Sequence, residues 1–272
     1  MTAARTARWL AWDGGRGFAP AADPGGDLLV ADSWLVEDGR VRALDRHEAR
    51  FAGSCARKGL ERSVVRRFWR DAVRELPRTG AWFPRVELHA DGTLALNVRP
   101  APEFGTSVRV LPWPYADPRT QPWCKGPDIG RLAQVRAQAR DAGADEALFR
   151  TGEGQVTESA TASLLWWDGP DLCLPAAEAR LLPGVTRAVV TGLARDRGVA
   201  VRRVRATLED LYDREVWLVN ALHGVRPVTE WVGTGRTAGP AGKASLWQEL
   251  WRAQARSLDD SRRESTPAHH LP

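Results

Sequence analysis

The sequence has few cysteines, few lysines and no long apolar run. Its three cysteines, Cys55, Cys124 and Cys173, are widely spaced and form no CxxC pair. We therefore expect neither a disulfide framework nor a structural zinc site. No stretch stays apolar over the roughly 20 residues that a helix needs to cross a bilayer. The N-terminus has no basic, apolar and small-residue signal pattern, so we expect a cytoplasmic protein that enters no membrane.

The charge is weakly basic, and its distribution argues against nucleic acid as a partner. The chain holds 39 Lys and Arg against 34 Asp and Glu, a net charge of +5, and the two signs are interleaved. Basic segments such as 201–205 alternate with apolar residues, as a half-exposed strand would. Most of the 13 tryptophans fall in helix or strand periods, which favours core or dimer packing over stacking on bases. A basic surface would instead attract a small anionic substrate.

The length and composition are typical of a globular protein with a sizeable core. The 272 residues are 43% hydrophobic and 27% charged. The sequence pattern changes near the proline-rich segment 112–122. Before it the pattern predicts hairpins and helices, and after it short strands separated by glycine. We predict an α+β N-terminal domain over residues 1–115 and a strand-rich α/β C-terminal domain over 116–258. A disordered tail is predicted over 259–272, where the pair His269-His270 is too short to indicate a metal site.

Turn residues and apolar spacing predict the local structure. Asp-Gly pairs at 38–39 and 91–92 predict two hairpin turns, because these residues tolerate positive φ. Gly59 predicts a break between two helices, and residues 1–27 show no period and predict an irregular lead-in. The expected helices lie within 47–77 and over 128–142, 186–197 and 244–258. The expected strands are 28–36, 41–44, 84–89, 93–99, 108–111, 146–150, 155–157, 162–167, 172–174, 199–204 and 215–219.

One lysine lies in a motif and is the first candidate for chemistry. Lys125 follows a Pro/Trp-rich extended run and precedes an amphipathic helix, whereas Lys58 and Lys243 lie in no motif. An amine shielded among cationic groups has a lowered pKa and can be neutral, as chemistry on a carbonyl requires. A solvated surface lysine is the ordinary alternative.

Two further segments suit the binding of a flat, phosphorylated group. Glu158 lies at a strand end among small residues, which would let a ring approach its carboxylate. The segment Pro183-Gly184-Val185-Thr186 precedes an apolar-periodic helix, so its backbone N–H groups could bind a phosphate. A surface glutamate and a simple turn are the ordinary alternatives.

In order, spacing and residue type, these motifs resemble the class IV aminotransferases, which are pyridoxal phosphate (PLP) enzymes of fold type IV. The resemblance covers about residues 28–235. It implies a two-domain α+β fold like that of D-amino-acid aminotransferase, with pyridoxal 5'-phosphate as cofactor and Lys125 as the Schiff-base residue. It also implies that Glu158 binds the ring nitrogen and keeps it protonated.

The resemblance implies the remaining cofactor contacts as well. Arg50 lies in a segment similar to the family's His-x-x-Arg-Leu motif, whose arginine grips the phosphate, a task that suits its planar fork. His47, in the same segment, is expected to be a structural histidine. The phosphate cup would be formed by Gly184, Val185 and Thr186, and the site would be closed by Asn220, Ala221 and Leu222.

Several positions depart from the family pattern. Ser163 stands where the family usually has asparagine, and Gly130 stands where branched-chain transaminases have tyrosine. Asp128 replaces an asparagine of lyase relatives. The region Trp34-Leu35 occupies a strand in which relatives often carry a substrate-facing arginine. These changes leave the cofactor prediction in place and affect mainly the prediction of the substrate.

Within the family the sequence favours aminodeoxychorismate lyase, which forms 4-aminobenzoate and pyruvate. The run Asn220-Ala221-Leu222, followed by Pro227-Val228, resembles lyases more than transaminases, and the basic charge suits a dianionic amino substrate. The alternatives are an aminotransferase acting on an amino acid and a keto acid in specialised metabolism, and a non-catalytic member that keeps the fold. Family members are homodimers, so we expect a homodimer.

Overall fold

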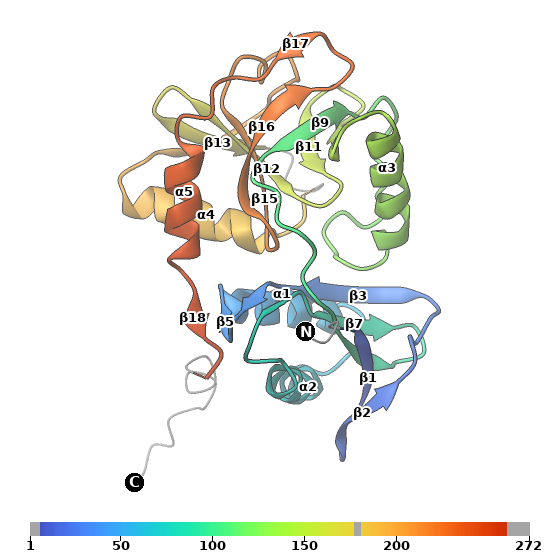
Figure 1. The fold of residues 1–272 in the computed structure, drawn as a ribbon. Helices are drawn as coiled ribbons and strands as arrows, with labels where there is room; N and C mark the ends of the chain where they lie inside the picture. The colour runs from blue at the N-terminus through green and yellow to red at the C-terminus, as the bar shows by residue number, and fades with distance from the viewer. Residues whose placement is uncertain (1–5, 177–180, 260–272) are drawn as a thin grey trace. The chain divides into compact units, whose positions relative to one another are not determined.

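The computed structural model describes residues 6–176 and 181–259 (Figure 1). The chain forms two compact units, one made of Met1–Pro102 with Gln254–Pro272 and the other of Glu103–Ala253. Both contain helices and strands, so the predicted α+β class is confirmed. None of the helices in the described ranges is long and apolar enough to cross a membrane. The predicted tail, with His269-His270, lies outside the described residues beyond Asp259.

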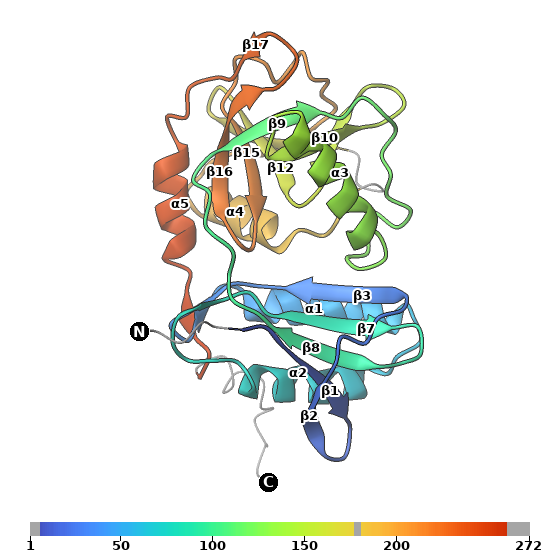
Figure 2. The ribbon, with the colours of Figure 1, turned by 45° about the vertical axis from the view of Figure 1, so that its right-hand side comes forward.

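The first unit is built on a five-stranded antiparallel sheet in the order β2-β1-β8-β7-β3 (Figure 2). Helix α1 contacts β3 and helix α2, and α2 contacts β2. Phe51 of α1 and Phe68 of α2 are fully buried and contact each other, with ring centroids 5.8 Å apart. The elements are β1 (Arg8–Asp13), β2 (Gly17–Ala21), β3 (Leu28–Ser33), α1 (Leu44–Ala56), α2 (Arg62–Arg74), β7 (Arg85–His89) and β8 (Leu94–Val98).

A small second sheet completes this unit, in the order β18-β5-β4-β6. Its strands are β4 (Val36–Glu37), β5 (Arg40–Val41), β6 (Ala81–Trp82) and β18 (Arg256–Ser257). Asp38 and Gly39 join β4 to β5 with φ values of 46° and 71°. Two consecutive positive φ angles make the tight hairpin turn that Asp-Gly favours.

The second unit contains nine strands, six of which close into a ring. The order is β11-β10-β9-β16-β15-β12, and a further pairing of β11 with β12 closes it. The remaining strands β13, β14 and β17 extend the sheet, and helices α3, α4 and α5 pack against it. The elements are β9 (Val108–Pro112), α3 (Ile129–Asp141), β10 (Glu146–Arg150), β11 (Val156–Ser159), β12 (Ser163–Asp168), β13 (Asp171–Pro175), α4 (Val185–Asp196), β14 (Val201–Val204), β15 (Val216–Asn220), β16 (Gly224–Trp231), β17 (Arg236–Thr237) and α5 (Ala244–Arg252).

The structure differs from the predicted domain limits. Strand β9 pairs with β10 and β16 of the second unit, so the division falls after Pro102 rather than near residue 115. At the other end α5 stops at Arg252, not at 258, and β18 returns to pair with β5 of the first unit. Both boundaries are set by strand pairing between segments that are distant in the sequence. The residues near each boundary therefore carry no local signal of it.

The strands β1, β2 and β16 were not expected from the sequence. The lead-in 1–27 contains β1 and β2, because residues 8–11 pair with β8 and a glycine-rich turn carries the chain back into β2. The long strand β16 carries Pro227, a residue that argues against a central strand. Pro227 is tolerated because antiparallel pairing with β15 ends there and parallel pairing with β9 begins at Val228.

Candidate functional site

Glu158 lies at the seam where the strand ring of the second unit closes. It is the residue of β11 that pairs with Ser163 of β12. The intervening turn is fixed by Ser159, whose hydroxyl exchanges hydrogen bonds with the Ala162 backbone at 3.0 and 3.1 Å. Glu158 is only 3% exposed. A buried carboxylate at this position needs specific partners to remain charged.

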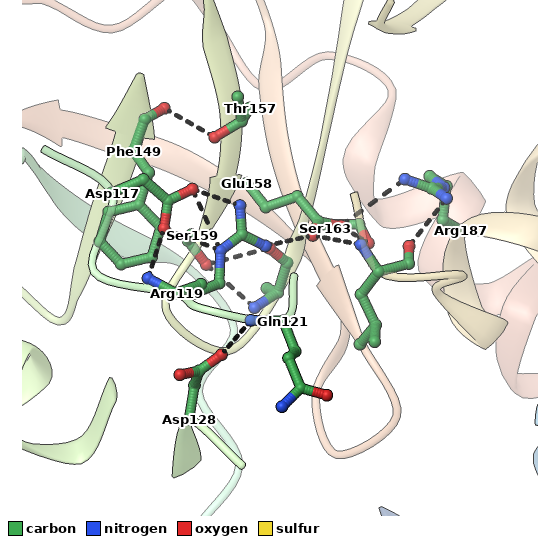
Figure 3. Close-up of polar contacts among 12 residues, drawn as sticks. Asp117, Arg119, Gln121, Asp128, Phe149, Thr157, Glu158, Ser159, Ser163 and Arg187 are labelled. Carbon is green, nitrogen blue, oxygen red and sulfur yellow. Dashed lines mark hydrogen bonds and ion pairs between the residues drawn. The ribbon is translucent and has the colours of Figure 1, made fainter. Parts of the chain in front are cut away.

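Both oxygens of Glu158 have such partners (Figure 3). Oε1 accepts a hydrogen bond from the Ser163 hydroxyl at 3.0 Å. Oε2 accepts two, from Arg119 Nη1 at 2.8 Å and from the Leu182 N–H at 2.7 Å. Arg187 Nη1 lies 3.6 Å from Oε1 and adds a second cation. The carboxylate is therefore held by hydrogen bonds from Ser163, Arg119 and Leu182 and by an ion pair with Arg187.

Arg119 is held between two carboxylates. Asp117 accepts from its Nε at 3.0 Å and from its Nη2 at 2.7 Å, while Nη1 reaches Glu158. The guanidinium also lies over the ring of Phe149, 5.5 Å from its centroid. Burial opposes the charge of Arg119, but the hydrogen bonds and charges of Asp117 and Glu158 outweigh it and raise its pKa above the ordinary arginine value.

The loop that carries Lys125 is fixed by Asp128. This carboxylate is 5% exposed and accepts from the Thr120 N–H and hydroxyl and from the Gln121 N–H, at 2.9–3.0 Å. Lys125 is half-buried, six residues after Arg119, and α3 begins at Ile129. The departure at Asp128 thus has a structural role, since it orders the loop before the lysine.

The predicted phosphate cup lies directly beside the Glu158 cluster, that is, Glu158 with its partners Ser163, Arg119, Leu182 and Arg187. Gly184 precedes α4, and a Cβ atom on it would stand 2.5 Å from the Ser163 hydroxyl oxygen. Val185 and Thr186 are buried in the first turn of α4, and their N–H groups have no hydrogen-bond partner among the described residues. Unpaired N–H groups at a helix start favour an anion.

Asn220 ends β15 and shapes the turn that follows. Its Oδ1 accepts from the N–H groups of Leu222 at 3.1 Å and His223 at 2.8 Å, and its Nδ2 approaches the Thr161 carbonyl at 3.4 Å. Asn220 therefore lies beside the β11–β12 turn, with Ala221 half-buried next to it. The structure thus brings together Glu158, Gly184, Val185, Thr186 and Asn220.

Arg50 belongs to the other unit. Its Nε and Nη2 bind the fully buried Asp32 at 2.7 and 2.8 Å, and His47 Nδ1 lies 2.7 Å from the same carboxylate. His47 is 2% exposed. The phosphate contact predicted for Arg50 remains a proposal; in the structure its Nε and Nη2 bind Asp32.

The partners of Glu158 could not be found from the sequence. Arg119 and Arg187 are two of many arginines, and they lie 39 and 29 residues from Glu158 along the chain. Of the residues that depart from the family pattern, Gly130 is exposed, and a Cβ atom added to it would meet open space. Trp34 is fully buried and packs on Trp69 at 4.7 Å, so it belongs to the core of its unit.

Comparison with known proteins identifies the family of the chain. A model of the family described as amino-transferase class IV matches residues 29–231. The chain is 30% identical over 116 residues to the aminodeoxychorismate lyase of Bacillus subtilis, covering 42% of this chain and 39% of that protein. The chain therefore matches about two fifths of the length of that curated relative.

Solved structures share the fold. A branched-chain aminotransferase from Thermoproteus uzoniensis has a TM-score of 0.77 at 18% identity, covering 92% of this chain and 99% of that one. The PLP-bound form of a hypothetical aminotransferase from Mycobacterium tuberculosis has a TM-score of 0.78 at 21% identity, covering 94% and 100%. Class IV enzymes use pyridoxal 5'-phosphate. Since the family model covers well over half of the chain, this protein belongs to the class IV aminotransferase family.

Proposed function

We propose that this protein is a PLP-dependent 4-amino-4-deoxychorismate lyase that forms 4-aminobenzoate and pyruvate. The observation that carries the cofactor assignment is the buried Glu158, bonded both to its strand partner Ser163 and to the loop that begins α4. Both features belong to one compact unit: a buried carboxylate, and the start of α4, where the N–H groups of Val185 and Thr186 have no partner among the described residues. These are the two complements that a pyridinium ring and its phosphate require.

The residues present fit that cofactor. Among the described residues, Oε1 of Glu158 accepts a hydrogen bond from Ser163, and a carboxylate oxygen can accept two, so a ring N–H can be added. The N–H groups of Val185 and Thr186, with the Thr186 hydroxyl, would hold the phosphate, and the absence of a side chain at Gly184 allows close approach. Arg50 is proposed as the cation for the same phosphate.

Lys125 is proposed as the residue that binds the cofactor aldehyde and later moves protons. When bound, the cofactor supplies an electron sink for charge that develops on the substrate carbon. Lys125 Nζ takes the proton from the carbon that bears the substrate amino group. The bond to the enolpyruvyl oxygen then breaks, and the released enol gains a proton as pyruvate. The ring becomes aromatic, and no acceptor is consumed.

Two observations support the lyase over the transaminase. Asn220, the first residue of the lyase-like run, is used structurally to shape the turn at the site. Gly130 leaves the fifth position after Lys125 without a side chain, where branched-chain transaminases carry a tyrosine. Among the curated relatives, the one from Bacillus subtilis is named an aminodeoxychorismate lyase and one from Methanocaldococcus jannaschii is named a putative branched-chain-amino-acid aminotransferase.

The deciding experiment separates the two reactions by their need for an acceptor. Purified protein is given 4-amino-4-deoxychorismate alone, and separately an amino acid with 2-oxoglutarate. We expect 4-aminobenzoate and pyruvate in equal amounts in the first tube. Glutamate appearing only in the second tube would show a transaminase. Lys125→Ala is the control, and it should lose activity and the mass that borohydride fixes onto the wild-type lysine.

We further propose that the protein works as a homodimer in the cytoplasm, as family membership suggests. The buried tryptophans give this no support, because Trp217, Trp247 and Trp251 pack inside the second unit. Tyr115 and Trp123 lie in the segment of the second unit between β9 and α3, which also carries Lys125. They are 69% and 46% exposed, and their side chains are available to an interface. Light scattering at micromolar concentration tests the proposal, and a fully active monomer would contradict it.

A further inference from the structure

The peptide of Leu182 is held on both sides by the charged residues at the site. Its N–H donates to Glu158 Oε2 at 2.7 Å, and its carbonyl accepts from Arg187 Nη2 at 2.9 Å. Arg187 Nη1 in turn lies 3.6 Å from Glu158 Oε1. The three groups therefore form a closed circuit between the carboxylate and the loop before α4. Figure 3 labels Glu158 and Arg187 of this circuit.

Packing buries most of this circuit. The Arg187 side chain is 13% exposed and that of Glu158 is 4% exposed, so the polar contacts are largely shielded from water. On the other side of the loop, Gly184 sits against the Ser163 hydroxyl that donates to Glu158. An asparagine at 163, usual in the family, would be larger in this contact. The loop thus approaches Glu158 closely enough for the Leu182 bond.

We propose that Arg187 is a positioning residue that couples the two ends of the cofactor site. This inference rests on the cofactor assignment of the proposed function. It holds equally for a lyase and for a transaminase. Arg187 is the third residue of α4, whose first two N–H groups face the proposed phosphate. It also binds the Leu182 peptide that holds Glu158. Fixing the phosphate end therefore fixes the carboxylate that meets the ring nitrogen.

The test compares cofactor forms that differ at one atom or one group. Pyridoxamine 5'-phosphate binds without a covalent bond to Lys125, its 1-deaza analogue lacks the ring nitrogen, and pyridoxamine lacks the phosphate. Affinities for all three are measured by tryptophan fluorescence for wild type, Arg187→Met and Arg187→Lys. Arg195→Met is the matched control, because Arg195 is exposed on the same helix. Thermal melts check that each variant is folded.

In the wild type, loss of the ring nitrogen should weaken binding about 10- to 100-fold, as for a charge-assisted hydrogen bond. In Arg187→Met this penalty should fall below about threefold, because the carboxylate is no longer held in place. Arg187→Lys keeps a cation without the fork and should give an intermediate penalty. Arg195→Met should keep the wild-type penalty.

The alternative results are separable. If Arg187→Met and Arg187→Lys weaken pyridoxamine 5'-phosphate and its deaza analogue by the same factor, Arg187 has only a structural role and the inference is wrong. The cofactor assignment would survive that result, since the wild type would still distinguish the two ligands. If the wild type binds none of the three, the cofactor assignment fails and the inference fails with it.

Discussion

Arg50 binds Asp32 through two parallel hydrogen bonds, from Nε at 2.7 Å and from Nη2 at 2.8 Å. Asp32 is fully buried in β3, and Arg50 comes from α1, so the pair fastens the helix to the sheet. Burial opposes the charge of Asp32, but Arg50 and His47 outweigh it and lower its pKa below the ordinary 3.8. An arginine predicted to bind phosphate thus also has a counter-charge within its own unit.

Asp32→Asn should lower the free energy of unfolding by about 3 kcal/mol, because it leaves a largely buried arginine without its counter-charge. Urea denaturation measures this. Glu75→Gln is the control, since its pair with Arg8 is exposed and its loss should cost less than about 1 kcal/mol. Equal effects of the two substitutions would contradict the structural role of Asp32.

The same pair should shape stability in acid. A carboxyl whose pKa is lowered by folding stabilises the protein above its unfolded pKa, near 3.8, and loses that contribution as the pH falls through the lower folded value. Wild-type stability should therefore decline below about pH 4 more steeply than that of Asp32→Asn. Thermal melts between pH 2 and 5 test this, and parallel curves for the two proteins would refute it.

His223 predicts a second pH effect, at higher pH. Burial, and then the charges of Arg226 and Arg136, lower its pKa from 6.5 to about 3, while its Nδ1 accepts from the Gly105 N–H at 3.1 Å. Between these values the unfolded chain binds a proton that the folded one excludes, so stability falls as the pH drops from 6.5 towards 3. His223→Gln should make the melting temperature less dependent on pH between 4 and 6.5. An unchanged slope would count against this.

Gly184→Ala tests the contact between the phosphate loop and the Glu158 cluster. The backbone at Gly184 has φ of −66°, which any residue adopts, so the obstacle is the Ser163 hydroxyl at 2.5 Å. The hydroxyl must turn away from Glu158, and we expect a loss of about 1 kcal/mol in stability. Adding Ser163→Ala removes the clash, since Cβ atoms at 3.6 Å are in ordinary contact. The double variant should thus cost less than the sum of the two single ones, and simple additivity would argue against the contact.

Glu158→Gln should retain the cofactor and lose rate by about 100-fold, because a neutral amide does not keep the ring nitrogen protonated. The substitution also leaves Arg119 facing Asp117 alone. Activity, cofactor absorbance and thermal melts are measured together. Asp145→Asn, which changes an exposed pair with Arg109, is the control. Unchanged turnover in Glu158→Gln would show that another group contacts the ring nitrogen.

Much of the fold could be predicted from the sequence, because the signals were local. Both Asp-Gly turns and the helix break at Gly59 depend on glycine conformations that a single residue sets. The strand at Glu146–Arg150 and the start of α4 after Gly184 also follow from nearby residues. Pairing between distant segments gave no such signal. Strand β1 and the end of α5 are determined by partners far along the chain.

The candidate site divides in the same way. Lys125 and Glu158 were identified because each lies in a short motif with a recognisable context. Arg119 and Arg187 were missed, since their role comes from folding and not from their neighbours in sequence. The competition of Asp32 for Arg50 was missed for the same reason, because the two residues are brought together only when α1 packs on β3.

The last described strand gives the first unit an unusual order of assembly. Arg40 in β5 donates to the Ala255 carbonyl at 2.8 Å, across 215 residues of chain, and Leu258 donates to Gly39 at 2.9 Å. On the ribosome β5 emerges early, and its partner β18 is made only after the whole second unit. Throughout synthesis β5 therefore presents an unpaired strand edge, which is prone to pairing with other chains. The second unit is contiguous and can finish folding first, so the nascent chain must protect its beginning until its end has been translated.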